Sequence, residues 1–170
     1  AAGNCVVAKP SEVTPMTGYL LSLICKKAGL PDGVLNIIHG TGPGCGSAIV
    51  SHPDIKAISF TGSTRAGKEI AATAAPMFKK ISLELGGKNP NIIFADCDWD
   101  KMMRVTLQSS FSNQGEICLC GSRILIEESI YEKFKHEFVA RVKKLTVGDP
   151  LDEKSRQGAI VSKMHFDKVM

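Results

Sequence analysis

A rhythm of short apolar strand, turn and helix, repeated through the first half of the chain, most constrains the fold. β-prone runs at 5–8, 34–38 and 57–60 are each followed by a turn and then by apolar residues at helical spacing. Such alternation is typical of βαβ units, whose strands pair in parallel and whose helices cover the sheet. The sequence therefore predicts an α/β fold with a Rossmann-like parallel sheet and helices on both faces.

The pattern changes after Gly86-Gly87, where a second series of elements begins. These are a strand at 91–94, a helix ending near Ser112, a strand at 123–126 and a long amphipathic helix capped by Ser129. We predict a domain boundary here, with residues 1–86 as one part and residues 87–170 as the beginning of a second α/β domain. The chain has no initiator Met and no closing element, so we expect it to be an internal piece of a longer protein.

Composition argues against several classes of protein. The chain is 44% hydrophobic and 22% charged, as globular proteins are. Its net charge of +4 comes from scattered Lys and Arg rather than from the basic stripe of a nucleic-acid-binding protein. Its apolar runs are shorter than the ~20 residues that span a bilayer. Six cysteines without disulfide or zinc spacing, and four histidines without metal-ligand spacing, predict no metal site and a reduced, cytoplasmic setting.

Candidate ligand-binding residues follow the predicted strands, because ligands bind at the carboxyl ends of an open parallel sheet. The features expected there, at one edge of one sheet, are Lys9, the glycine-rich loop 40–46, the turn that begins at Thr61-Gly62-Ser63 and Glu84. The turn could hold a phosphate on its backbone N–H groups, although tight strand-to-helix geometry alone also explains its glycines. Lys9 and Glu12 could bind ribose hydroxyls or form a solvated pair.

The candidate nucleophile is Cys118, which follows the polar, glycine-containing run Asn113-Gln114-Gly115. A thiol in such a place can form a covalent acyl intermediate, which a carboxylate can then help to hydrolyse. Glu84 is the candidate carboxylate, and within its apolar run it either faces water from a strand or is desolvated, as a general base would be. A buried structural thiol is the alternative for Cys118 and for its neighbour Cys120.

Four short stretches occur in the order and at about the spacing of the aldehyde dehydrogenase superfamily, which the whole chain resembles. They are Lys9-Pro10-Ser11-Glu12, Phe60-Thr61-Gly62-Ser63, Leu83-Glu84-Leu85-Gly86-Gly87-Lys88 and Gly115-Glu116-Ile117-Cys118. The run from Asn113 to Cys120 looks most like the 2-aminomuconate semialdehyde dehydrogenase branch. The resemblance implies an incomplete aldehyde dehydrogenase fold, with residues 1–86 as its NAD-binding part and residues 87–170 as the first part of its catalytic domain.

The resemblance also implies a reaction. Cys118 would attack the aldehyde to give a thiohemiacetal, hydride transfer to NAD would leave a thioester, and Glu84 would activate the water that hydrolyses it. The backbone N–H of Cys118 would contribute to the oxyanion hole. Lys9 and Glu12 would hold the adenosine ribose, and Glu12 would favour NAD over NADP by repelling a 2′-phosphate. The other residues implied around the dinucleotide are Ser11, Gly42, Gly46, Phe60, Gly62, Ser63, Leu85 and Gly86.

Parts of the family's active site are expected outside this sequence. A side-chain oxyanion donor, an Asn, would precede Ala1, and the Glu and Phe that position the nicotinamide ribose would follow Met170. We therefore expect the full-length protein to oxidise a small-molecule aldehyde as a homo-oligomer, dimer or tetramer, and the segment alone to be inactive. Two alternatives stay open: a CoA-acylating relative, which would typically lack the carboxylate of Glu84, and a catalytically silent, crystallin-like structural protein.

Overall fold

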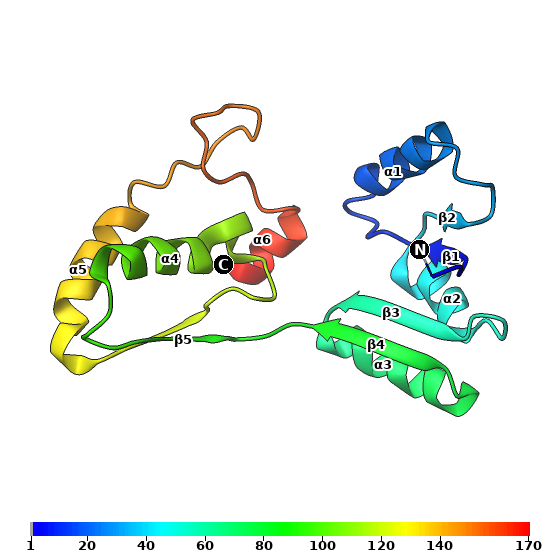
Figure 1. Ribbon diagram of the computed structural model, residues 1–170, viewed down its shortest axis with the longest axis horizontal. Coiled ribbons are helices and arrows are strands. Elements are labelled where there is room, and N and C mark those ends of the chain that lie inside the picture. The colour runs from blue at the N-terminus through cyan, green and yellow to red at the C-terminus, as the bar shows by residue number, and fades with distance from the viewer. Residues whose placement is uncertain (1) are drawn as a thin grey trace. The chain divides into compact units, whose positions relative to one another are not determined.

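The computed structural model describes residues 2–170 and divides the chain into two units, one ending at Leu85 and the other running from Gly86 to Met170 (Figure 1). Each unit has its own parallel strands, helices and buried cluster. The roles expected for the two parts of the chain, cofactor binding and catalysis, remain predictions.

The first unit alternates strands and helices, as its sequence pattern predicts. Its strands are β1 (Val6–Ala8), β2 (Leu35–Ile37), β3 (Ala57–Gly62) and β4 (Lys80–Leu85). Its helices are α1 (Met16–Lys27), α2 (Ser47–Ser51) and α3 (Thr64–Ala74), with a π-helical turn at Gly42–Gly46 and a 3₁₀ turn at Ala75–Met77. β1 pairs with β2 and β3 pairs with β4, both in parallel. The expected α/β class is confirmed.

The strands differ from the single sheet that was expected. Within residues 2–170, β1–β2 and β3–β4 are separate two-stranded ladders. β1 ends at Ala8, and Pro10, two positions on, has no N–H with which to extend the ladder. Lys9 follows β1 and Glu84 lies in β4, so these two candidates belong to different ladders rather than to one edge of one sheet.

A small buried cluster of Val50, Ile58 and Ala74 ties α2, β3 and α3 together. Lys79, which directly precedes β4, is also buried, with 8% exposure. Its ammonium donates to the backbone carbonyls of Val50 and His52, both at 2.6 Å. These carbonyls lie at the C-terminal end of α2, where a positive charge is favourable. The contact joins the start of β4 to α2.

The second unit has two parallel strands and three α-helices. Its strands are β5 (Pro90–Ile93) and β6 (Arg123–Ile126), and its helices are α4 (Trp99–Phe111), α5 (Tyr131–Val142) and α6 (Lys163–Val169), with 3₁₀ turns at Ser112–Gly115 and Glu128–Ile130. The buried cluster comprises Ile93, Met103, Phe134 and Phe138. The rings of Phe134 and Phe138 are stacked, with centroids 5.0 Å apart. This core packs β5 with α4 and α5.

Ser129 does not cap α5, contrary to the sequence prediction. It lies inside the 3₁₀ turn that precedes the helix, and the N-cap position belongs to Ile130. Its hydroxyl donates to Oε1 of Glu127 at 2.7 Å. The Ser129 hydroxyl is therefore engaged by Glu127, and no side chain among residues 2–170 caps the N-terminus of α5.

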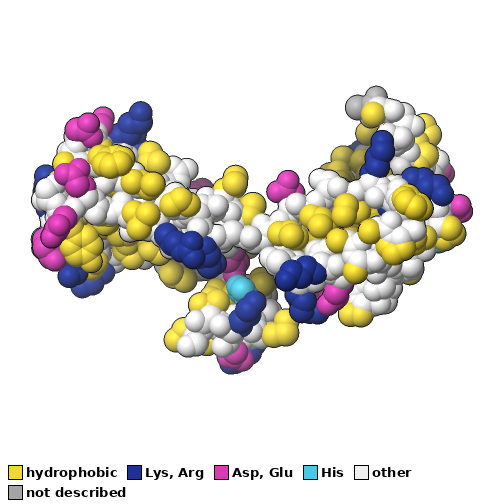
Figure 2. Space-filling view, turned by 90° about the horizontal axis from the view of Figure 1, so that it is seen from below, with side chains coloured by type: hydrophobic (Ala, Val, Ile, Leu, Met, Phe, Trp, Pro, Cys, Tyr) yellow, Lys and Arg dark blue, Asp and Glu magenta, His cyan; other side chains and the backbone are white. Residues whose placement is uncertain are grey.

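Many large apolar side chains lie at the surface, as Figure 2 shows for one face. Helix α1 exposes six of them to between 47% and 63%: Met16, Tyr19, Leu20, Leu21, Leu23 and Ile24. The buried clusters therefore use only part of the apolar side chains that the chain carries.

Two features are missing from the part of the chain that the structure describes. None of the helices in residues 2–170 combines the length and the apolar character that crossing a membrane requires. The same residues contain no group of three or more His, Cys, Asp or Glu side chains placed to hold a metal ion.

Replacing Lys79 with methionine removes the donor from two backbone carbonyls and keeps most of the side-chain volume. Leaving buried polar groups without a partner costs about 1–3 kcal/mol, so we expect Lys79→Met to lower the free energy of unfolding by that amount. The exposed neighbour Lys80 provides a matched control. Lys80→Met should change the free energy of unfolding by about 0.5 kcal/mol or less. Urea denaturation followed by circular dichroism measures both, and equal losses would contradict the role of the buried ammonium.

Candidate functional site

Lys9 and Glu12 form an ion pair just after β1. The Lys9 ammonium lies 3.4 Å from Oε2 of Glu12 and donates to the carbonyls of Pro10 at 2.7 Å and Gly40 at 3.2 Å. The Lys9 side chain is 14% exposed, whereas that of Glu12 is 49% exposed. The lysine therefore holds the loop after β1 to the loop after β2, and the glutamate presents its carboxylate to solvent.

The surroundings of Glu12 favour its ionised form. Hydrogen bonds from the backbone N–H groups of Glu12 itself and of Gly42, followed by the Lys9 ammonium, hold the pKa of the Glu12 carboxyl below its ordinary value. The N–H of Gly42 lies 3.5 Å from Oε1. Since the folded pKa is lowered, ionised Glu12 stabilises the fold above its unfolded-state pKa, and this contribution is lost as the pH falls through the folded value.

The glycines after β2 bring the backbone close to this pair. Thr41 Oγ1 accepts from the N–H of Gly44 at 3.3 Å and caps the turn. A Cβ atom on Gly46 would lie 3.8 Å from Cε of Lys9, and a Cβ atom on Gly42 would meet no atom within 4 Å. Gly42 therefore leaves open space near Glu12, in which a ligand could approach the backbone.

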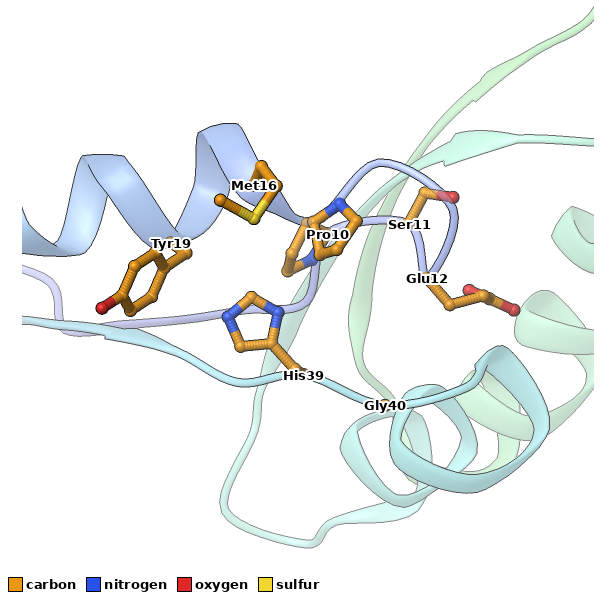
Figure 3. Close-up of a pocket in the computed structure, with 8 residues that line it drawn as sticks. Pro10, Ser11, Glu12, Met16, Tyr19, His39 and Gly40 are labelled. Atoms are coloured by element: carbon orange, nitrogen blue, oxygen red, sulfur yellow. The ribbon is translucent and has the colours of Figure 1, made fainter. Parts of the chain in front are cut away.

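An open groove of about 320 Å³ adjoins the same loop (Figure 3). It is lined by Pro10, Ser11, Glu12, Pro15, Met16, Tyr19, His39 and Gly40. Figure 3 shows Met16 and Tyr19 extending from α1 and His39 coming from the segment after β2. The hydroxyl of Ser11 accepts from the N–H of Val13 at 3.4 Å. Ser11, Glu12 and Gly40, the last as part of the loop 40–46, were expected at a ligand site from the sequence. Met16 and Tyr19 were not, because apolar residues at helical spacing normally face a core.

Phe60, Gly62 and Ser63 lie together where β3 meets α3. The Ser63 hydroxyl accepts from the N–H of Ala66 at 3.2 Å and caps α3. The Phe60 ring crosses Gly62, since a Cβ atom there would lie 2.5 Å from Cζ of Phe60. The close approach of the Phe60 ring therefore requires a glycine at position 62, and Ser63 follows it as the cap of the N-terminus of α3, the positive end of the helix dipole.

The β3–β4 ladder places Glu84 and Leu85 beside this turn. Glu84 pairs with Thr61 and Leu85 pairs with Gly62. The sequence left open whether Glu84 faces water from a strand or is desolvated. In the first unit Glu84 is exposed, so its side chain faces water. Gly67 in α3 lets Leu85 approach closely, because a Cβ atom there would lie 2.7 Å from Cδ2 of Leu85.

Cys118 is exposed in the loop between the 3₁₀ turn Ser112–Gly115 and β6. We call residues 116–122 the thiol loop. Its second thiol, Cys120, is 6% exposed and lies 4.0 Å from the carbonyl oxygen of Ser112. Cys120 has the surroundings of a structural thiol, whereas Cys118 lies where a substrate can reach it.

Asn89 holds the thiol loop through its side-chain amide. Its Nδ2 donates to the carbonyl oxygens of Cys118 at 2.6 Å and Cys120 at 3.1 Å. Gly87 passes close to the first of these carbonyls, because a Cβ atom on it would lie 3.5 Å from the oxygen, while one on Gly86 would meet nothing within 4 Å. Sequence reasoning missed Asn89, although an amide between a double glycine and a strand was a signal that could have drawn attention to it.

Three consecutive residues before the thiol loop have left-handed backbone conformations. Their φ angles are 49° at Asn113, 57° at Gln114 and 76° at Gly115. Asn and Gly tolerate this region, but a residue such as Gln costs roughly 1–2 kcal/mol there. Strain of this kind persists only where the surroundings fix it, and it is common at functional sites.

Comparison with known proteins identifies a family and relatives. A protein-family model described as "Aldehyde dehydrogenase family" matches residues 1–170. A Danio rerio protein named 2-aminomuconic semialdehyde dehydrogenase is 53% identical over 169 residues, which are 99% of this chain and 35% of that protein. The chain therefore spans about a third of the length of the curated relatives it matches.

Solved structures share the fold. An aldehyde dehydrogenase of Bartonella henselae is 42% identical, with a TM-score of 0.95 over 99% of this chain and 35% of the other. A betaine aldehyde dehydrogenase of Staphylococcus aureus, solved in complex with NAD+, is 38% identical, with a TM-score of 0.93 over 97% of this chain and 33% of the other. These likenesses confirm the fold class expected from the sequence.

The pKa of Glu12 should rise, but stay below its ordinary value of 4.5, when Lys9 is replaced with methionine. The two backbone N–H groups contribute more to the lowering than the lysine does, and they remain in the variant. Carbon NMR titration of Glu12 Cδ measures the change in pKa. Lys26→Met is the control, because Lys26 lies in the last turn of α1, away from Glu12. A complete return to the ordinary pKa would contradict the part assigned to the backbone.

Replacing Asn89 with leucine should loosen the thiol loop. The two lost hydrogen bonds contribute about 1–3 kcal/mol together, so amide hydrogen exchange at 117–120 should become about 10-fold faster or more. Asn91→Leu is the matched control, because its amide donates to Oγ1 of Thr106 at 3.1 Å instead. Hydrogen exchange followed by mass spectrometry makes the comparison, and identical exchange at 117–120 in both variants would contradict the contact.

Proposed function

Because the chain belongs to the aldehyde dehydrogenase family, we propose that it carries part of the active site of an enzyme that oxidises an aldehyde to its carboxylic acid with NAD+. The observation that carries the proposal is the thiol loop. Cys118 is exposed there, Asn89 donates to its carbonyl, and a strained turn precedes it. A thiol on a backbone fixed in this way is suited to attack a carbonyl carbon.

In the first stage, the thiolate of Cys118 attacks the aldehyde carbon. A C–S bond forms, and the carbonyl oxygen becomes an alkoxide to which the backbone N–H of Cys118 donates. Bound NAD+ would supply the acceptor for the hydride that this carbon releases. The acyl group is then held on Cys118 as a thioester.

In the second stage, the carboxylate of Glu84 takes a proton from water. The water oxygen attacks the thioester carbon, the C–S bond breaks, and the carboxylic acid and the Cys118 thiolate are released. The exposed position of Glu84 on β4 supports its access to water. Its presence favours hydrolysis over the CoA-acylating alternative.

Residues of the first unit fit a dinucleotide. The Lys9 ammonium and the ionised Glu12 carboxylate, 3.4 Å apart, offer donors and an acceptor for the two hydroxyls of a ribose. Gly42 leaves open space near them, and the N-terminus of α3 favours a phosphate. The negative charge of Glu12 would repel the 2′-phosphate of NADP. The remaining residues proposed around the dinucleotide are Ser11, Gly46, Phe60, Gly62, Ser63, Leu85 and Gly86.

The division of roles follows the same proposal. Residues 1–86 form the NAD-binding part, and residues 87–170 begin the catalytic domain. The name of the Danio rerio relative supports 2-aminomuconate semialdehyde as a substrate. The free cysteines support a reducing, cytoplasmic setting, in which the full-length enzyme acts as a homo-oligomer. Residues 1–170 alone are expected to be inactive.

The test measures NADH formation by the full-length protein with a panel of aldehydes that includes 2-aminomuconate semialdehyde. Cys118→Ala should abolish the activity, because it removes the nucleophile. Cys5→Ala is the matched control, since Cys5 is also an exposed free thiol, and it should retain the activity. Activity that survives in Cys118→Ala would show that the nucleophile is wrongly assigned.

The same assay separates the proposal from its alternatives through Glu84. Glu84→Gln should slow acid release about 10²–10⁴-fold and let the acyl group accumulate on Cys118, where mass spectrometry detects it. Glu69→Gln, another exposed carboxylate of the first unit, should not. Unchanged acid production in Glu84→Gln would contradict the role of Glu84 and so reopen the CoA-acylating alternative. An absence of both activity and NAD binding in the wild type would favour a structural protein.

A further inference from the structure

Gln157 lies in the segment between α5 and α6, and its side-chain amide contacts the turn that precedes the thiol loop. Its Nε2 donates to the carbonyl oxygen of Phe111 at 2.7 Å, and its Oε1 accepts from the N–H of Gln114 at 3.1 Å. One amide therefore satisfies a backbone acceptor at the end of α4 and a backbone donor in the turn. These groups are partly buried, where polar groups left unpaired are unfavourable.

The turn bridged by Gln157 is the strained one. Asn113 and Gln114 both have left-handed φ angles, and the bond to the N–H of Gln114 fixes the chain where it would otherwise relax. Two hydrogen-bonded turns follow directly, one closing 113–116 and the other closing 117–120. Because no free stretch of chain separates these turns, a change at Gln114 is passed on to Cys118.

Gln157 is itself anchored by its backbone. Its N–H donates to the carbonyl of Thr146 at 3.0 Å, and its carbonyl accepts from the N–H of Gly148 at 3.0 Å. A second contact to the same region joins Nε2 of His165, in α6, to Oε1 of Glu116 at 2.8 Å. The chain after α5 therefore holds the region before Cys118 at two places, and neither contact uses the thiol itself.

We propose that Gln157 is a positioning residue for Cys118, whose amide clamps the left-handed turn and so fixes the orientation in which the thiol meets the aldehyde. The inference rests on the proposed function of Cys118 as the nucleophile. A purely structural role would stabilise the second unit and leave the thiol of each folded molecule equally reactive. The two roles therefore differ in the turnover measured for each folded active site.

The test uses two variants of the full-length protein. Gln157→Leu removes both hydrogen bonds, and Gln157→Glu keeps an acceptor but replaces the amide donor with a carboxylate oxygen. Gln108→Leu is the matched control, because Gln108 is an exposed glutamine of α4. Iodoacetamide labelling of Cys118, followed by peptide mass spectrometry with Cys5 as the internal reference, gives the thiol reactivity. Turnover is then expressed as kcat for each titrated Cys118.

We expect Gln157→Leu to lower kcat per titrated thiol about 10–100-fold, as small misplacements of a reacting group do. The labelling rate of Cys118 should change by at least about 10-fold, and the KM for NAD+ should stay unchanged. Gln157→Glu should change both quantities in the same direction, and it replaces the leucine variant if that variant fails to fold. Gln108→Leu should match the wild type.

Wild-type kcat and labelling rate in the Gln157 variants, with only the stability lowered, would overturn the inference. The labelling rate needs neither aldehyde nor NAD+, so it separates this inference from the proposed function. If the wild type shows no oxidation that depends on Cys118, the proposed function fails. A labelling rate that still changes in Gln157→Glu would then support the clamp, and an unchanged rate would reject it.

Discussion

Parallel pairing of neighbouring strands is the constraint on which the rest of the structure depends. Two parallel strands cannot be joined by a tight hairpin, so each pair needs a longer crossover, and both strands then end at the same side. In the first unit, α3 lies in the crossover from β3 to β4, and the pairing sets Leu85 beside Gly62. In the second unit, α4 and the thiol loop form the crossover from β5 to β6. Cys118 therefore occupies a connection that the fold requires.

Much of this arrangement could be predicted because its signals are local. The β-prone run at 123–126 became β6 with the expected bounds, and the helix expected after the Gly62 turn is α3. Ser129 failed as a cap because a 3₁₀ turn already included it, a competition that residue type alone does not reveal. Whether the strand pairs join into one sheet was also not predictable, because it depends on the open edges of the ladders and not on the pattern within a strand.

The contacts that fix the thiol loop could not be predicted, because they join residues far apart in the sequence. Asn89 lies 29 positions before Cys118, and Gln157 lies 46 positions after Phe111. Nothing in the spacing of an isolated amide shows which carbonyl it will meet. The family resemblance pointed to Cys118 and Glu84 through their motifs, but the residues that hold the backbone lie outside those motifs. The residues proposed for the chemistry could therefore be named from the sequence, whereas the contacts that hold the thiol loop became visible only in the fold.

The late position of Gln157 in the chain has a consequence for synthesis on the ribosome. Gln157 lies 43 positions after Gln114, so at a rate of roughly 5–20 residues per second the nascent turn waits about 2–9 s for its clamp. During that time the backbone before Cys118 is free to leave the left-handed region, because no amide yet holds it. In the newly made chain, Asn89 is already present to hold the thiol loop, but the turn before Cys118 gains its second support only after the segment following α5 has been translated and has docked.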